Sequence, residues 1–227
     1  IPVKENFQTS ATRYWDLLHT RLDIAFDMEQ EHVLGEAELT LTPYFYTQDD
    51  LTLDAKGMDI HALKVNSKDA EFTYDGQQLY IELASAVTKG QNITVLVDYT
   101  AKPSELEMNT ASDAIEDDRG LYFINARGED PNKPIQIWTQ GEPESNSVWF
   151  PTIDKPNERC TQEVFVTVED QFVTLSNGLL IGSTDHGDGT RTDYWKQDLP
   201  HAPYLFMLAI GDYAVVKDTW KDIDVHY

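Results

Sequence analysis

The sequence has only one cysteine, Cys160, among its 227 residues, which excludes an internal disulfide framework. Basic residues are scarce as well: 17 lysines and arginines accompany 40 aspartates and glutamates, for a formal net charge of −23. Nucleic acids and anionic membranes are bound through clustered lysine and arginine, which this sequence never assembles. We therefore expect no nucleic-acid partner. We interpret most carboxylates as solvated surface and Cys160 as a structural residue.

Long apolar runs are also missing, since no segment approaches the roughly 18 apolar residues of a membrane-spanning helix. The chain begins at Ile1, without the charged and apolar regions of a signal peptide, so we expect that an upstream segment has been removed or left out. The location stays open between the cytoplasm and, after signal removal, the periplasm or the exterior.

Recognisable catalytic motifs are absent too. The six histidines never form the i, i+4 pair of a helical zinc site, and no Cys-x-x-Cys occurs. The Gly-x-Ser-x-Gly elbow of serine hydrolases is missing as well. We predict neither a metal site nor a catalytic residue within this chain.

What the sequence does contain is alternation of apolar and polar residues with period two, which is typical of half-buried strands. It is clearest over 18–28 and 35–41, and Asp75-Gly76 and residues 186–189 carry hairpin-turn signals. Further strands are predicted over 51–55, 63–65, 72–74, 79–83, 93–99, 121–124, 135–138, 164–168, 172–175, 192–196 and 204–215. The predicted fold over 1–227 is all-β, a large curved sheet or sandwich. An acidic loop at 103–120 is predicted, with a break between two layers near 102–120.

One segment stands apart from this pattern. Trp138-Thr139-Gln140-Gly141-Glu142-Pro143 is followed by Trp149-Phe150-Pro151-Thr152-Ile153-Asp154-Lys155-Pro156 and by Arg159-Cys160-Thr161. Prolines 143, 151 and 156 fix the backbone φ angle and remove donors, so the segment is a rigid connection. Such a connection holds Gln140 and Glu142 in set directions, and binding groups are often placed on rigid loops of a β scaffold.

These residues resemble the amino-terminal domain of the aminopeptidase N and leukotriene hydrolase family of zinc metallopeptidases. Gln140, Glu142, Phe150, Pro151, Asp154, Pro156 and Thr161 fall in register with its motif, and Gly120-Leu121-Tyr122, Ser176-Asn177-Gly178, Tyr204-Leu205 and Gly211-Asp212-Tyr213 match further turns. Four positions depart from the motif: Ser147, Thr152, Arg159 and Gln162 replace its Arg, Cys, Lys and Phe.

The resemblance implies a saddle-like, substrate-anchoring β-domain laid against a thermolysin-like catalytic domain that this chain lacks. Glu142 would bind the free α-ammonium of a peptide, and Gln140 would line the pocket for its first side chain. Zinc would be bound by the full-length enzyme and not by this chain, whose sequence contains neither Gly-x-Met-Glu-Asn nor His-Glu-x-x-His. The implied partners are peptides with free amino termini and the downstream catalytic domain, and the chain alone is expected to be inactive.

Other interpretations stay open. The chain could belong to a homologue without zinc ligands that acts as a protein-interaction scaffold. It could also be a free-standing β-sandwich that binds sugars or peptides through exposed aromatic residues among Trp15, Tyr44, Tyr46 and Trp195. Glu142 could be a solvated carboxylate, and the Gln140 amide could cap its own turn. We interpret Tyr122 and Trp149 as packing residues.

Overall fold

The computed structural model of the chain describes residues 10–106 and 119–226, and it is all-β, as predicted. The strands are β1 (Trp15–Asp27), β2 (His32–Pro43), β3 (Gln48–Asp54), β4 (Met58–Val65), β5 (Lys68–Asp69), β6 (Phe72–Tyr74), β7 (Gln78–Val87), β8 (Ile93–Ala101), β9 (Gly120–Ile124), β10 (Gln136–Gln140), β11 (Cys160–Glu169), β12 (Val173–Ser176), β13 (Leu179–Asp185), β14 (Thr190–His201), β15 (Leu208–Gly211), β16 (Lys217–Trp220) and β17 (Ile223–His226). Three short 3-10 turns are η1 (Pro103–Glu105), η2 (Asn146–Val148) and η3 (Pro203–Leu205).

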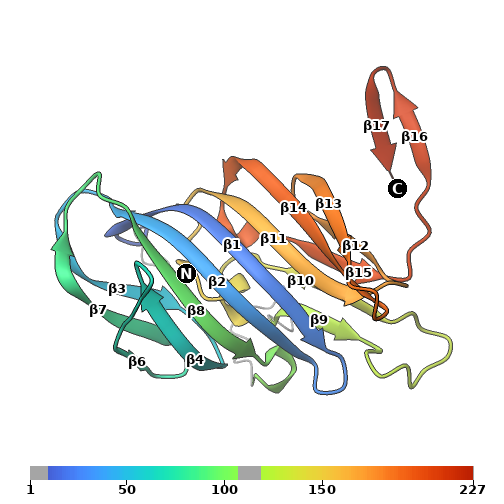
Figure 1. The fold of residues 1–227 in the computed structure, drawn as a ribbon, viewed down its shortest axis with the longest axis horizontal. Helices are drawn as coiled ribbons and strands as arrows, with labels where there is room; N and C mark the ends of the chain where they lie inside the picture. Colours follow the sequence, from blue (N-terminus) through green and yellow to red (C-terminus); the bar gives the residue numbers. More distant parts are fainter. Residues whose placement is uncertain (1–9, 107–118, 227) are drawn as a thin grey trace, which may run out of the picture.

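The largest element is an eight-stranded sheet in the order β13-β14-β11-β1-β2-β8-β4-β5 (Figure 1). Neighbours run antiparallel except β1 and β11, which pair in parallel. In β1 and β2, apolar residues that face inward alternate with polar residues that face solvent, which is why these strands were predictable from sequence. This sheet contains strands that precede residues 102–120 in the chain and strands that follow them.

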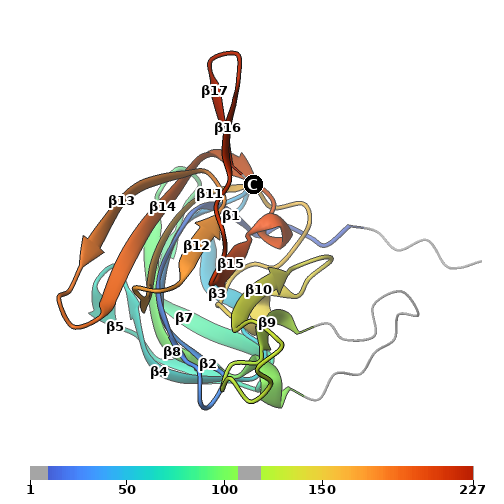
Figure 2. The same cartoon turned by 90° about the vertical axis from the view of Figure 1, so that its right-hand side faces the viewer.

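Two smaller sheets lie on the concave side of this large sheet (Figure 2). One has four strands in the order β12-β15-β10-β9, and the other has three in the order β3-β7-β6. The hairpin β16–β17 projects from the body. No helix in the described part of the chain is long and apolar enough to span a bilayer.

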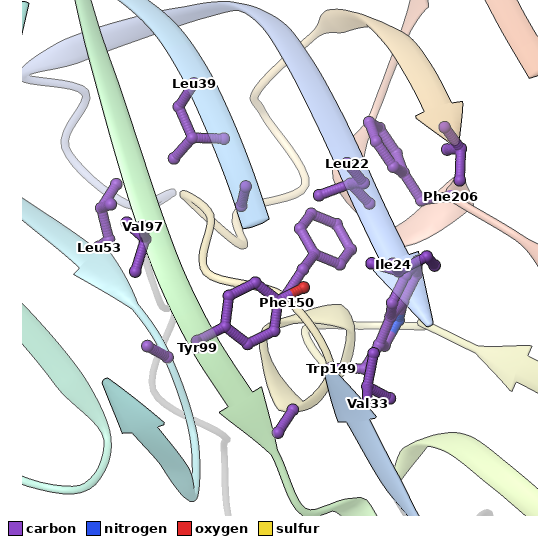
Figure 3. Close-up of a cluster of buried hydrophobic side chains, with 14 of the residues drawn as sticks. Leu22, Ile24, Val33, Leu39, Leu53, Val97, Tyr99, Trp149, Phe150 and Phe206 are labelled. Atoms are coloured by element: carbon purple, nitrogen blue, oxygen red, sulfur yellow. The ribbon is translucent and has the colours of Figure 1, made fainter. Parts of the chain in front are cut away.

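The core fills the space between the sheets (Figure 3). Phe150 is fully buried among side chains that include Leu22 of β1 and Tyr99 of β8, and its ring stacks on Phe206 with centroids 5.3 Å apart. Trp149 contacts Phe150 edge-on at 4.5 Å. The connection that carries Gln140 and Glu142 is therefore tied into the core through its aromatic residues, as we interpreted for Trp149.

Two groups of expectations need correction. The stretch 204–215 is not one strand, because it contains the end of η3 and then β15. The carbonyls of Pro203 and Phe206 accept hydrogen bonds from a side chain, Asn146, instead of from a neighbouring strand. β13, β5 and the hairpin β16–β17 were not predicted. Of the loop predicted over 103–120, residues 107–118 lie outside the described residues.

The aromatic surface that suggested a free-standing binding sandwich is only partly present. Trp15 and Trp195 are 4% and 8% exposed, so both belong to the core. Their indole N–H groups donate to the Asp50 carbonyl and to Thr174 Oγ1, each at 3.0 Å. Tyr46 is 82% exposed, whereas Tyr44 is half-buried beneath the Arg13 guanidinium.

Candidate functional site

The candidate site begins where β10 ends, at Gln140. Gly141 follows, and a Cβ atom there would lie 2.5 Å from both Asn146 Nδ2 and the Tyr204 carbonyl oxygen. Only glycine allows the chain to pass this point without displacing a neighbour. On the neighbouring strand, Gly120 pairs with Gln140, and a Cβ there would lie 2.0 Å from the Ser145 carbonyl oxygen. Two glycines thus let the connection after β10 pack tightly against the sheet.

The buried amide of Asn146 fixes the middle of the connection. Its Nδ2 donates to the carbonyls of Pro203 at 2.7 Å and Phe206 at 3.1 Å, and its Oδ1 accepts from Trp149 Nε1 at 2.8 Å. These bonds join η2 to the segment before β15. A fully satisfied buried amide of this kind defines a single local conformation.

A pair of aspartates holds the far end of the connection. Asp154 Oδ2 accepts from the Ser147 backbone N–H at 2.8 Å, and the Asp154 backbone N–H donates to Asp54 Oδ2 at 3.0 Å. Burial raises the pKa of Asp154 to about 6, although the hydrogen bond from Ser147 favours its ionised form. Asp54 also forms a two-way backbone bridge with Thr152, which attaches the connection to β3.

Glu144 is held by two lysines, of which one pairs with its carboxylate and the other with its backbone. Its carboxylate lies 2.7 Å from Lys155 Nζ, and its backbone carbonyl accepts a hydrogen bond from Lys56 Nζ. Lys155 also lies 3.7 Å from Asp54. Burial acts to lower the pKa of Lys155, but the hydrogen bond that its ammonium donates to the Glu144 carboxylate, together with the nearby negative charges, raises this pKa overall. Glu144 therefore serves to hold the connection in place.

Glu142, two residues earlier, is in a different situation. Its side chain is exposed and follows a half-buried Gln140, and its peptide bond to Pro143 is cis. Within residues 10–106 and 119–226 no hydrogen bond or ion pair of the Glu142 carboxylate is found, and none of the Gln140 amide. The carboxylate is thus available to a cation from outside the domain.

The domain does not by itself enclose this carboxylate. Hollows of about 490 and 380 Å³ lie along the outer side of β3, and residues such as Arg13, Asp50 and Lys155 line the larger one. Neither Gln140 nor Glu142 contributes to either hollow. A closed pocket around Glu142 would need a second surface opposite this one.

The described residues do not fit a metal ion, because no group of three or more His, Cys, Asp or Glu side chains among them could hold one. Cys160 is buried, and burial raises the pKa of its thiol to about 12, so it is unsuited as a ligand or nucleophile. The part of the chain that the structure describes therefore offers neither a metal site nor a reactive thiol.

Sequence reasoning missed the residues that support the loop. Lys56 lies 88 residues before Glu144 and Asp54 lies 100 residues before Asp154, and no local pattern connects either pair. Asn146 carried no signal either. The prolines and the family motif were the only indications that this connection is held rigidly.

The described residues thus form an all-β domain with one large bent sheet, two small sheets on its concave side and a connection after β10 that bears Glu142. Residues 12–205 match the peptidase M1 N-terminal domain family. The chain belongs to this family, which confirms the resemblance seen in the sequence.

The chain is similar in sequence to curated proteins whose names indicate different functions. TFIID subunit 2 of Gallus gallus, a transcription initiation factor, is 24% identical over 88% of this chain and 20% of that protein. Leucine aminopeptidase 2 of Phaeosphaeria nodorum is 24% identical over 92% of this chain and 32% of that protein. The chain therefore spans between a fifth and a third of these relatives.

Among solved structures, an M1 zinc metallopeptidase mutant from Deinococcus radiodurans, bound to a Tyr-Ser-Ala substrate, superposes with a TM-score of 0.78. The sequences are 21% identical, and the match covers 97% of this chain and 48% of that one. At this identity the likeness shows the fold. The roles of Gln140 and Glu142 stay predictions.

Proposed function

We propose that this chain is the substrate-anchoring domain of a zinc metallo-aminopeptidase that removes amino-terminal residues from peptides. Glu142 binds the free α-ammonium of the peptide, and Gln140 lines the pocket for the first side chain. The observation that carries the proposal is the contrast between two glutamates on one rigid connection. Glu144 is neutralised by lysine, whereas the carboxylate of Glu142 is exposed and has no partner among the described residues.

The electrostatics of the loop support this assignment. A carboxylate that binds an ammonium group must be held in place without a permanent cation of its own. The bonds of Asn146, Asp154 and Lys155 fix the backbone on the carboxyl side of Glu142. The attraction between carboxylate and ammonium grows as a second surface excludes water from around them.

Zinc enters the proposal only as a property of the longer enzyme, where it would activate water for attack on the first peptide bond. The role of this chain is to bind and orient the amino end of the substrate. The 227-residue chain alone is expected to be inactive.

The test is Glu142→Ala and Glu142→Gln in the full-length protein. We expect kcat/KM for unblocked peptides to fall roughly 100- to 1,000-fold in both variants, because both remove the charge that pairs with the ammonium. Slow cleavage of the corresponding N-acetylated peptides, which lack this charge, should change far less. Glu129→Ala, at an exposed site on the 125–135 loop, should leave both rates unaltered. Full activity of Glu142→Ala would remove Glu142 from the mechanism.

A second function is favoured by one comparison. The similarity to a protein named as a transcription initiation factor subunit supports a scaffold that binds other proteins without hydrolysis. Zinc content and peptide hydrolysis of the full-length protein, with and without a chelator, separate the two functions. A metal-free, inactive full-length protein would support the scaffold.

A further inference from the structure

β3 has a free edge along which backbone hydrogen-bonding groups are unpaired. The strand stands at one end of the sheet order β3-β7-β6, so it pairs with β7 on one side only. Successive residues of a strand direct their N–H and C=O groups to opposite edges. Because Asp54 exchanges backbone hydrogen bonds with Thr152 on the side away from β7, the backbone groups of Asp50 and Thr52 also point away from β7.

Few of these groups are bonded within the domain. The Asp50 carbonyl accepts a hydrogen bond from Trp15 Nε1 at 3.0 Å. In the described part of the chain, no hydrogen bond is found for the backbone N–H of Asp50 or for the backbone N–H and carbonyl of Thr52. Such an open edge is a template for pairing with another extended chain.

The two hollows on the outer side of β3 provide space beside this edge. The hollow of about 490 Å³ is lined by Asp50, Thr52 and Asp54 of β3, together with Arg13 and Lys155. Asp50 and Thr52 also line the hollow of about 380 Å³, which extends over residues of β7 and β6. The two hollows therefore adjoin, and we call them together the β3 groove.

The basic residues of the β3 groove already have acidic partners. Arg13 Nε lies 2.5 Å from Glu158 Oε1, and Arg13 Nη2 lies 3.0 Å from Glu158 Oε2. Lys155 Nζ lies 2.7 Å from the Glu144 carboxylate and 3.7 Å from that of Asp54. Both cations are thus compensated within the domain, so neither is free to bind an acidic ligand.

Three acidic residues of the groove, Asp50, Glu71 and Glu82, are not compensated. Their side chains are exposed, and among residues 10–106 and 119–226 no hydrogen bond or ion pair of their carboxylates is found. Strand register places Asp50 directly opposite Glu82, where like charges repel. A cationic ligand would relieve this repulsion.

We infer that the β3 groove binds an extended segment of another protein that contains lysine or arginine at alternate positions. The segment adds to the sheet as a strand beside β3 and bonds to the free backbone groups of Asp50 and Thr52, which is the β-augmentation mode of recognition. Alternate side chains of a strand point to one face, so its basic residues reach Asp50 and Glu82 together. Gln140 and Glu142 do not line the groove, so the inference is independent of the proposed function.

A second copy of this chain suits the groove less well. Pairing of β3 with β3 would bring together two sets of the same uncompensated carboxylates, and each copy carries a net charge of −23. The free charges of the groove therefore favour a basic partner over a dimer.

Binding of a synthetic peptide to the full-length protein tests the inference. The probe is a heptapeptide in which lysine alternates with threonine, acetylated at its amino end and labelled with a dye at its carboxyl end for fluorescence anisotropy. Because the acetyl group removes the α-ammonium, Glu142→Ala should leave the affinity unchanged. The same peptide with glutamate in place of lysine should bind about tenfold or more weakly.

Two variants test the charge and the edge separately. Asp50→Asn should weaken binding about three- to tenfold, whereas Asp49→Asn, which changes the charge equally at an exposed neighbour outside both hollows, should weaken it less than about twofold. Thr52→Pro removes a free N–H without breaking a hydrogen bond to β7, and it should weaken binding about tenfold.

A comparison of two methylated peptides uses the unaltered protein, so it decides the point even if Thr52→Pro folds poorly. One peptide is methylated at the backbone nitrogens of the lysines and the other at those of the threonines. Their affinities should differ about tenfold, because only alternate residues of an added strand direct their N–H groups toward β3.

Equal affinities of the lysine and glutamate peptides, of the two methylated peptides, or of the Asp50→Asn and Asp49→Asn variants would overturn the inference. So would the absence of binding to the full-length protein, or loss of binding in Glu142→Ala, which would place the peptide at the candidate site. None of these results depends on peptide hydrolysis, so the groove and the anchoring role of Glu142 can fail separately.

Discussion

Asp154 is a carboxylic acid buried at the base of the candidate site, only 1% exposed. Because burial raises its pKa to about 6 from an ordinary value of 3.8, the folded protein retains a proton that the unfolded chain has lost between these pH values. The contribution of Asp154 to stability therefore falls as the pH rises from about 4 to 6 and is constant above that range. Two pKa units correspond to about 3 kcal/mol.

We predict that Asp154→Asn removes this dependence. An asparagine carbonyl can still accept the Ser147 N–H without the cost of burying a charge. Urea denaturation measures the free energy of unfolding of both proteins. The value for the variant minus the value for wild type should increase by up to about 3 kcal/mol from pH 4 to pH 7, so the variant gains stability relative to wild type. Glu71→Gln, at an exposed site, should show less than about 0.5 kcal/mol of such change. A pH-independent difference for Asp154→Asn would refute the assignment.

For single residues, the sequence indicated that Glu142 is a candidate binding group, but it did not indicate which carboxylates of the connection already have a cationic partner. Glu142 and Glu144 are two residues apart and look alike in the sequence. The lysine that holds the Glu144 backbone, Lys56, is 88 residues away in the chain. The distinction arises from tertiary contacts, so only the structure separates the available carboxylate from the neutralised one.

At the scale of elements, the close packing of the chain where β10 ends requires glycine at position 141. We predict that Gly141→Ala destabilises the domain by about 1 to 3 kcal/mol, because the new methyl group would displace Asn146 and the backbone at Tyr204. In the full-length protein, kcat/KM for unblocked peptides should fall as well, since the adjacent Glu142 moves with the loop. Chemical denaturation and steady-state kinetics measure the two effects.

Gly182→Ala is the matched control for this prediction. Gly182 lies in β13, and a Cβ there would meet no atom within 4 Å. This variant should be neutral or slightly stabilising, because alanine reduces the entropy of the unfolded chain. Equal stability of the two alanine variants would show that the space around Gly141 is not restrictive.

Elements were predictable wherever one face of a strand is buried. β1, β2 and β8 alternate because the core lies on one side of each. β13 escaped prediction because all seven of its residues are exposed, so burial imposes no alternation on Leu179, Leu180 and Ile181. Trp15 and Trp195 were wrongly considered as exposed residues for a related reason. Composition does not indicate which aromatic residues find a buried partner for the indole N–H.

At the scale of the whole molecule, the two edges of the eight-stranded sheet differ. One edge is β5, which has two residues, Lys68 and Asp69, both charged and exposed. Short charged edges of this kind resist pairing with other chains. The other edge is β13, with seven residues and three adjacent large aliphatic side chains that are 72%, 50% and 53% exposed. Only a register shift between Leu180 and Gly182 interrupts its ladder with β14.

The net charge of −23 opposes association through this β13 edge. Charge repulsion between molecules is screened over about 10 Å at 0.1 M salt and about 3 Å at 1 M. We therefore predict that the 227-residue chain associates increasingly as sodium chloride is raised, and that Ile181→Lys suppresses this association. Light scattering at increasing salt concentration measures both effects.

The control for Ile181→Lys must make the same change in charge at a site away from the β13 edge. Asn92→Lys does so, because Asn92 is exposed in the turn before β8. If association proceeds through the β13 edge, a lysine at position 181 places an unpaired charge in the new interface and slows association. Asn92→Lys only lowers the net negative charge, so its association should be as fast as that of wild type or faster. Equal behaviour of the two variants would place the contact elsewhere. The exposed Trp138 and Leu175 of the four-stranded sheet would then mark the next surface to examine, and Leu175→Lys would examine it by the same comparison.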